Sequence, residues 1–181
     1  MIENLLQEFS QVLKELPELT CVGDPLLRTK AEEVEYGEGL KIAERLKTAL
    51  QKFRTITGIG RGLAAPQIGI SKAVFVVYLD DQFQVFINPK IIGKSKINNY
   101  FRECCISSLI LWADVKRPKT VTLRWVDEKG NIQKKRYIDF EARLIQHEYD
   151  HLQGVVNLDR AEVGSIEFVG DITKEKLRNS R

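Results

Sequence analysis

The amino-acid sequence predicts a single α+β domain, with antiparallel strands and hairpins arranged around one helix. The chain has 181 residues, about the length of one domain. Segments with helical spacing of apolar residues are mixed with segments rich in β-branched and aromatic residues, which is typical of an α+β fold. No repeat, low-complexity segment or linker divides the chain. We therefore expect one domain over residues 1–181, with a helical extension at 1–17 and a tail at 161–181.

Three segments have the apolar spacing of amphipathic helices. The first covers residues 2–16 and ends at Pro17, which cannot continue a helix. The second covers about 39–53 and stops at TGIGRG, where three glycines allow unusual backbone shapes. The third covers about 139–153, and Gly154 is its expected C-terminal stop. The stripe of the first helix consists of Ile2, Leu5, Leu6, Phe9, Val12, Leu13 and Leu16.

The expected strands are short and lie between the second and third helices. KAVFVVYL at 72–79 is a β-branched and aromatic run bounded by turn residues. Residues 84–87 and 90–97 are two further expected strands. Apolar residues alternate with polar ones from Val121 to Trp125, and DEKGN then turns the chain into a partner strand at 132–138, which predicts a hairpin.

The composition excludes several classes of protein. With 43% hydrophobic and 29% charged residues, the chain has the composition of an ordinary soluble globular protein. No apolar run approaches the ~20 residues that span a membrane, so no membrane partner is expected. A net charge of +3 gives no footprint for direct nucleic-acid binding. The KKR at 134–136 and the final KEKLRNSR are expected to be solvated surface.

Three cysteines, Cys21, Cys104 and Cys105, make a poor disulfide framework, because the number is odd and two are adjacent. Thiols that are free or bound to metal fit a reducing compartment better. The N-terminal sequence has no basic region ahead of an apolar block, so it does not predict a secretory signal. We expect a cytoplasmic protein, or one of an organelle matrix if a transit peptide was removed.

Both histidines of the chain lie in the third expected helix, within HEYDH at 147–151. Positions four apart on a helix share one face, so His147 and His151 point the same way and can bind one metal ion. Glu148 projects about 100° away, beside the ion, where a carboxylate can take a proton from water. Phe140 and Leu144 share the histidine face, which is therefore expected to be interior. A metal-binding helix is favoured over two solvated histidines on a surface helix.

Two histidines do not complete a catalytic metal site, which usually has three protein ligands and one open position. No histidine is left, so the third candidate is a cysteine of FRECCISS at 101–108. A thiolate from Cys104 or Cys105 gives a site of two histidines and one cysteine, compatible with zinc or ferrous iron. The alternative is that each cysteine is only a small buried apolar residue.

Three motifs occur in order along the chain: GRGLAAPQ at 60–67, ECCIS at 103–107 and HEYDH at 147–151. Together they resemble the three signature blocks of the peptide deformylase family, enzymes that remove the formyl group from the N-terminal methionine of newly made proteins. VGDP at 22–25, VKRP at 115–118 and the GxxNLDR pattern at 154–160 resemble segments that accompany those blocks. The resemblance covers about residues 22–160, and three ordered motifs are a much stronger signal than HExxH alone.

The resemblance implies an α+β fold and one divalent metal per chain, with Fe²⁺ as the expected native ion and Zn²⁺ or Ni²⁺ as alternatives. Matched block to block, the cysteine ligand is Cys105, which joins His147 and His151. The expected substrate is a formylated nascent peptide, which is met at the ribosome.

The resemblance also implies which groups act on the substrate. Gln67 and the backbone N–H of Ile106 are expected to stabilise the formyl oxygen, while Glu148 moves the protons. Gly60 and Gly62 are expected to let the backbone come close to the substrate, rather than to form a plain surface turn. The expected substrate-binding residues are Gly60, Arg61, Gly62, Phe140, Arg143 and Leu144.

The chain departs from the family pattern at four places. Cys104 stands where the family has glycine, so it either crowds the loop or competes as a ligand. Residues 108–110 replace an apolar residue followed by proline and glycine, which predicts another loop shape. Arg61 and Arg143 stand where the family has apolar residues beside the methionine pocket. We expect Arg143 at the rim with its head solvated, and a pocket that is more polar or more open.

Three functions stay open at this point. An active metal-dependent deformylase is favoured, because the three ligands, the glutamate and the glutamine are all present. A deformylase-like protein that binds peptide termini with little catalysis is the second, and the departures at Cys104, Arg61 and residues 108–110 suggest it. A zinc endopeptidase of the HExxH kind is the third and weakest, since the Cys105 and Gln67 motifs argue against it.

Overall fold

The computed structural model describes residues 2–168, without the side chains of residues 2–6 and 8. Within this range the chain forms three α-helices, three short 3₁₀ turns and eight strands. The helices are α1 (Ile2–Glu15), α2 (Tyr36–Thr57) and α3 (Asp139–Leu152), and the turns are η1 (Pro25–Arg28), η2 (Ala65–Ile68) and η3 (Asn157–Arg160). The strands are β1 (Gly62–Ala64), β2 (Val74–Leu79), β3 (Gln82–Lys94), β4 (Asn98–Glu103), β5 (Leu111–Pro118), β6 (Thr120–Val126), β7 (Ile132–Ile138) and β8 (Glu167–Phe168).

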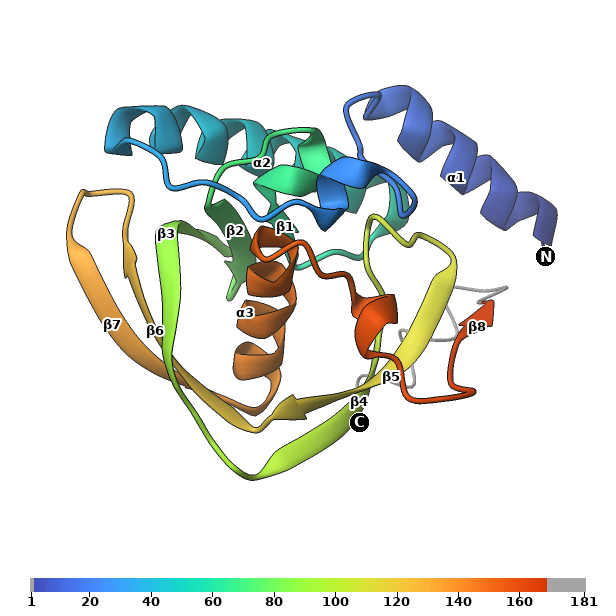
Figure 1. The fold of residues 1–181 in the computed structure, drawn as a ribbon. Coiled ribbons are helices and arrows are strands. Elements are labelled where there is room, and N and C mark those ends of the chain that lie inside the picture. Colours follow the sequence, from blue (N-terminus) through green and yellow to red (C-terminus); the bar gives the residue numbers. More distant parts are fainter. Residues whose placement is uncertain (1, 169–181) are drawn as a thin grey trace.

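The strands pair antiparallel in two sheets, which confirms the predicted α+β class. One sheet has the order β1-β2-β3-β6-β7 and the other β4-β5-β8. Helix α3 stands in the centre of the molecule and contacts strands of both sheets, while α2 runs across the top (Figure 1). The helix that carries both histidines is therefore held between the two sheets.

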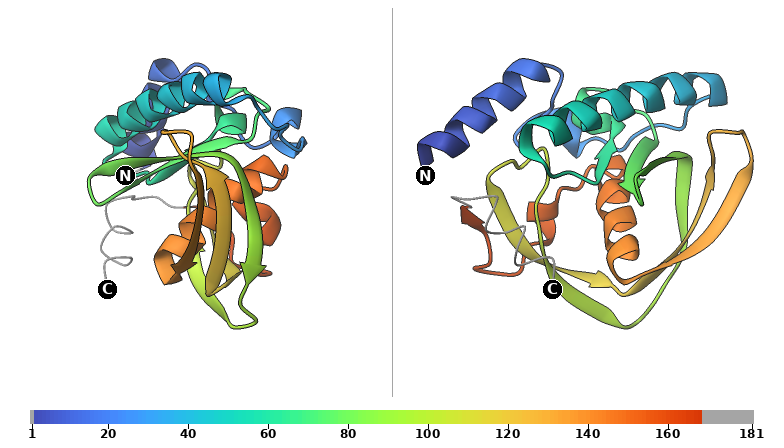
Figure 2. Two further views of the ribbon diagram at one scale, coloured as in Figure 1. Left: turned by 90° about the vertical axis from the view of Figure 1, so that its left-hand side faces the viewer. Right: turned by 180° about the vertical axis from the view of Figure 1, so that it is seen from behind.

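Strand β2 is buried on both faces, which explains its unbroken apolar sequence. Val74 and Val76 pack into the core beneath α2, whereas Phe75 and Val77 pack into the core on the side of α3. The side and rear views show the two helices on opposite sides of this strand (Figure 2). Burial of each such side chain contributes roughly 1.5–3 kcal/mol, so α3 rests on a rigid platform.

The two strands predicted at 84–87 and 90–97 are one long strand, β3. The Asn-Pro pair at 88–89 separates the two expected segments, but the strand continues through it with shifts in register against β6. Asn88 has the left-handed φ of 50°, and its side-chain amide bonds to the backbone N–H and C=O of Val34. These bonds replace the ladder bonds that the irregularity removes.

Strands β4 and β5 were not predicted, whereas the hairpin of β6 and β7 is confirmed. Strand β4 (NNYFRE) is mostly exposed and has no clear alternation of apolar residues, so its sequence carries little strand signal. The hairpin turn is fixed by Asp127, whose side chain accepts the backbone N–H groups of Lys129 and Asn131.

Helix α1 ends before Pro17 as predicted, and α2 extends beyond its predicted limits at both ends, from Tyr36 to Thr57. Val12 and Leu16 of the first stripe are buried in the core beneath α2. The side chains of Ile2, Leu5 and Leu6, and the tail at 169–181, lie outside the described residues. No helix within 2–168 has the length and apolar content that a membrane span requires.

Gly154 ends α3 as predicted. Its φ is 73°, and an added Cβ would lie 2.6 Å from the carbonyl oxygen of Arg28. The backbone N–H of Ala31 also bonds to Leu152 at the end of the helix. A side chain at Gly154 would thus meet both backbone strain and a rigid backbone neighbour.

We expect Gly154→Ala to lower the free energy of unfolding by more than the roughly 1–3 kcal/mol of left-handed strain alone. Gly164→Ala is the matched control, because Gly164 has a φ of 77° and nothing within 4 Å of an added Cβ. Urea unfolding of both variants measures the difference. An equal loss in the two variants would contradict the close contact with Arg28.

Candidate metal centre and active site

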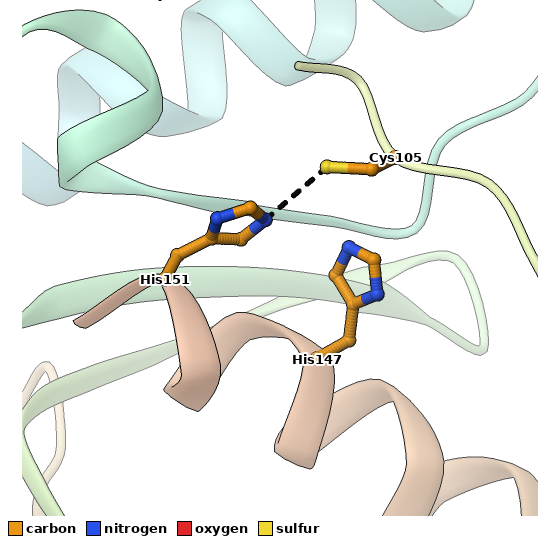
Figure 3. Close-up of side chains that lie close together, drawn as sticks. All are labelled: Cys105, His147 and His151. Carbon is orange, nitrogen blue, oxygen red and sulfur yellow. Dashed lines mark hydrogen bonds between the residues drawn. The ribbon is translucent and has the colours of Figure 1, made fainter. Parts of the chain in front are cut away.

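Three donor side chains meet at the centre of the molecule. His147 and His151 project from one face of α3, and Cys105 reaches them from the loop after β4 (Figure 3). Their ligand atoms lie within 4.8 Å of one another, and Cys105 Sγ is 3.2 Å from His151 Nε2. The predicted convergence of these three residues is therefore present in the structure. Two imidazoles and one thiolate at this spacing fit a divalent zinc or iron ion.

The electrostatics of Cys105 favour the form that binds metal. Burial by itself raises the pKa of the thiol, but the neighbouring His151 and His147 outweigh this and hold the pKa well below its usual value. The thiolate is the form of cysteine that acts as a metal ligand. The site thus favours an anionic sulfur before any ion enters.

Glu103 orients the first histidine, a role that the sequence reasoning missed. Its Oε2 is 3.0 Å from His147 Nδ1, which leaves Nε2 of that ring to face an ion. Burial would raise the pKa of the Glu103 carboxyl, but hydrogen bonds from Arg117 and His147 hold it far below its usual range. A carboxylate behind a ligating imidazole fixes its tautomer and ring orientation. The available signal was its place as the first residue of ECCIS.

A buried ionic network surrounds Glu103. Arg117 donates to both of its oxygens, at 2.6 and 2.9 Å, and a third donor of Arg117 reaches Asp150 at 2.7 Å. Arg160 donates to both oxygens of Asp150. Because a buried charge is costly unless it is paired and hydrogen-bonded, this network fixes the outer side of the metal centre.

Glu148 lies beside the three donors, as the helical spacing predicts. Its side chain is buried, and burial raises its pKa to about 7. The Oε2 atom has no hydrogen-bond partner within the described part of the chain. A carboxyl with a pKa near neutrality is suited to take and return a proton.

Gly62 makes room for this carboxyl. A Cβ at Gly62 would lie 2.2 Å from Glu148 Oε1, so any other residue would displace the glutamate. We predicted that Gly62 lets the backbone approach the substrate. The structure shows in addition that the missing side chain leaves space for Glu148.

Gln67 stands in turn η2 with its amide facing the cysteine. Its Oε1 accepts the backbone N–H of Ala64 at 2.8 Å, and its Nε2 lies 3.5 Å from Cys105 Sγ and 3.2 Å from Ser107 Oγ. The bond to Ala64 fixes which end of the amide turns toward the site. Its N–H₂ group is thus available at the metal centre.

The backbone on either side of the site is held by the segment that follows α1. Thr20 donates its backbone N–H to Gln67, and Val22 donates to Ser107, at 2.8 and 2.9 Å. These two bonds join the turn that carries Gln67 to the loop that carries Cys105. The segment at 20–22 therefore positions two of the three site motifs.

A cavity of about 620 Å³ opens onto the donors. It is lined from α1, from the end of α2, from the loop at 58–62, from β4 and the loop after it, and from α3. All six predicted substrate-binding residues line it, and Gln67, Ile106 and Glu148 do so as well. Phe9 and Val12 of α1 also line it, which was not predicted.

Two expectations about α3 are wrong. Arg143 was expected at the rim with a solvated head, but its side chain is only 6% exposed and pairs with Glu103. The guanidinium lies inward because the buried Glu103 carboxylate provides a charged hydrogen-bond partner in place of the water that Arg143 loses. Phe140 was expected on an interior face but is 47% exposed, because this first turn of the helix borders the cavity mouth.

The other departures from the family pattern lie around the cavity. Arg61 is exposed and stacks over the ring of Phe140, with 5.6 Å from its guanidinium carbon to the ring centre. Cys104 lines the cavity but is not among the three clustered donors. After Cys105 the loop closes into a turn, in which Leu109 has a φ of 52° and donates to the Cys105 carbonyl.

A buried cysteine and two histidines, a carboxyl with a raised pKa and an adjoining cavity define the site of a metal-dependent hydrolase. Comparison with known proteins narrows this class. The family model for polypeptide deformylase matches residues 16–165. A peptide deformylase from Pseudothermotoga lettingae is 42% identical over 141 residues, covering 78% of this chain and 80% of the relative.

Solved structures agree. A peptide deformylase from Synechococcus elongatus, in complex with actinonin, has a TM-score of 0.70 and 36% identity, covering 81% of this chain and 79% of that one. A probable peptide deformylase from Synechococcus phage S-SSM7 has a TM-score of 0.72 and 34% identity, covering 78% of this chain and 97% of that one. The chain belongs to the peptide deformylase family.

Replacement of each adjacent cysteine distinguishes which of them is a metal ligand. We expect Cys105→Ser to lose most of the metal that the parent retains through gel filtration, because a serine hydroxyl is a poor ligand for zinc or iron. Cys104→Ser is the matched control and should retain about as much as the parent. Elemental analysis of the purified proteins provides the measurement, and the reverse result would make Cys104 the ligand.

Proposed function

We propose that this protein is an active metal-dependent deformylase, which removes the formyl group from the N-terminal formylmethionine of nascent peptides. The observation that carries the proposal is the meeting of Cys105, His147 and His151 with Glu148 at one end of the cavity. Membership of the peptide deformylase family supports the same activity.

Residues of this chain account for each role in amide hydrolysis. Bound at the three donors, a divalent cation would supply the Lewis acidity that makes water nucleophilic near neutral pH. Glu148 takes the proton of the attacking water, whose oxygen adds to the formyl carbon. Gln67 Nε2 and the Ile106 N–H then donate to the formyl oxygen as its charge develops. Glu148 returns the proton to the leaving amine, and formate departs.

The metal and the substrate can be proposed more closely. We propose one divalent ion per chain, with Fe²⁺ native and Zn²⁺ or Ni²⁺ able to replace it, since a site of two imidazoles and one thiolate suits all three ions. We also propose that the substrate is met on the ribosome, as the N-terminus of the nascent chain emerges. The cavity then receives the first side chain between Arg61, Phe140 and Leu144, which line it.

The activity is tested by formate release from formyl-Met-Ala-Ser, with protein purified anaerobically and loaded with Fe²⁺. We expect turnover in the parent and a loss of at least about a hundredfold in Glu148→Ala, the scale of general acid–base catalysis. Metal content should stay at the level of the parent, because Glu148 is not one of the three donors. Absence of turnover in a parent that holds one metal per chain would contradict the proposal.

Arg61 is expected to change the preference for the first side chain. It lies exposed at the cavity, whereas the four terminal N–H groups of Arg143 are engaged in hydrogen bonds. Arg61→Ile should lower kcat/KM for formyl peptides with an acidic first side chain by about 1.4- to fivefold, the value of an exposed ion pair of about 0.2–1 kcal/mol.

The same variant should leave kcat/KM for formyl-Met-Ala-Ser unchanged or slightly raised. Arg54→Met is a matched control, because Arg54 also lines the cavity but stacks over Tyr78 and bonds to Gly60. An identical ratio of acidic to methionine substrates in the parent and in Arg61→Ile would sink the idea of an altered pocket.

A further inference from the structure

Arg143 stands one helical turn before His147 on α3, and both side chains bond to the same carboxylate. Arg143 Nη1 donates to Glu103 Oε1, while His147 Nδ1 meets Glu103 Oε2 at 3.0 Å. The two oxygens of one buried carboxylate thus join the arginine to a metal ligand. This residue was expected at the rim of the substrate pocket.

The guanidinium is fixed in place by more than Glu103. Nη1 also donates to the carbonyl of Val115 at 3.0 Å, and Nη2 donates to the carbonyl and to the side-chain oxygen of Asn99, at 3.1 and 2.7 Å. These acceptors belong to β4 and β5, so Arg143 ties α3 to the small sheet. A group held on four acceptors cannot turn to meet a substrate, and it holds Glu103 firmly.

The charges around Glu103 give Arg143 a second effect. Arg117 and Arg143 both bond to Glu103, while Arg117 and Arg160 both bond to Asp150. Glu103 therefore has two guanidinium partners, whereas Arg160 pairs with Asp150 alone. Two cationic partners keep Glu103 ionised and hold it beside His147.

We infer that Arg143 is a positioning residue of the metal centre, which clamps Glu103 so that the His147 ring presents Nε2 to the ion. Arg117 holds the Glu103 carboxylate through Nε and Nη2. Arg143 adds a second guanidinium donor from α3. Without Arg143, Glu103 loses its guanidinium partner on α3, the helix that also carries His147. This inference rests on the proposed function only in that Cys105, His147 and His151 bind a metal.

The test uses three variants of the full chain and measures metal binding apart from activity. Arg143→Met removes the charge and the donors but keeps a long apolar side chain. Arg143→Lys keeps the charge but lacks the planar guanidinium with its several fixed donors. Arg160→Met is the matched control, because Arg160 belongs to the same ionic network but pairs with Asp150 and not with Glu103. The dissociation constant for Zn²⁺ is measured by chelator competition, and the visible spectrum is recorded with Co²⁺.

We expect Arg143→Met to bind Zn²⁺ about 10–100-fold more weakly, which is the usual cost of losing a partner behind a metal ligand. Its Co²⁺ spectrum should change, since the His147 ring is held less firmly. Arg143→Lys should recover part of the affinity, while Arg160→Met should match the parent within about twofold in affinity and in spectrum. Urea unfolding of each metal-free variant shows whether it folds.

Parent-like affinity and spectrum in Arg143→Met would overturn the inference, and so would an equal loss in Arg160→Met. If Arg143→Met does not fold, Asn99→Ala takes its place, because it removes one acceptor that fixes Arg143. A several-fold weaker affinity for Zn²⁺ supports the clamp, and an unchanged affinity overturns it. A parent that binds no Zn²⁺ would instead defeat the proposed function, so the two failures are distinguishable.

Discussion

The metal centre depends on one buried carboxylate, Glu103, and on its ability to hold three segments together. A carboxylate that is removed from water is stable only if charged partners and donors replace the water. Here Arg117 comes from β5, and Arg143 and His147 come from α3. Because Cys105 follows Glu103 by two residues, the interactions that satisfy the carboxylate also bring the thiol to the histidines. The small sheet and the metal site therefore share the same stabilising contacts.

The chemistry of the site follows from contrasts in environment among a few groups. Glu103 is surrounded by cations and keeps its charge. Glu148 directly follows His147 on α3 and is buried, and its Oε2 has no hydrogen-bond partner within residues 2–168. One carboxylate therefore supports a ligand, while the other can exchange a proton near neutral pH. Gly62 preserves this contrast, since it leaves the space that the second carboxylate occupies.

Residue patterns along the sequence predicted those elements that depend on the spacing of nearby residues. The three helices, the hairpin of β6 and β7 and the meeting of His147 with His151 follow from spacing along the chain. Strand β4 could not be found in this way, because it is held by pairing with β5 and not by an apolar pattern. Arg143 was placed at the rim because arginine is rarely buried. Only the tertiary fold shows that Glu103 lies within its reach.

The lining of the cavity by α1 has a practical consequence. Phe9 and Val12 face the cavity, and the segment at 20–22 bonds to the backbone of Gln67 and Ser107. Part of α1 therefore belongs to the cavity wall, and residues 20–22 support the turn and the loop of the site. A truncation that removed α1 would take Phe9 and Val12 out of the cavity and leave it without part of its wall.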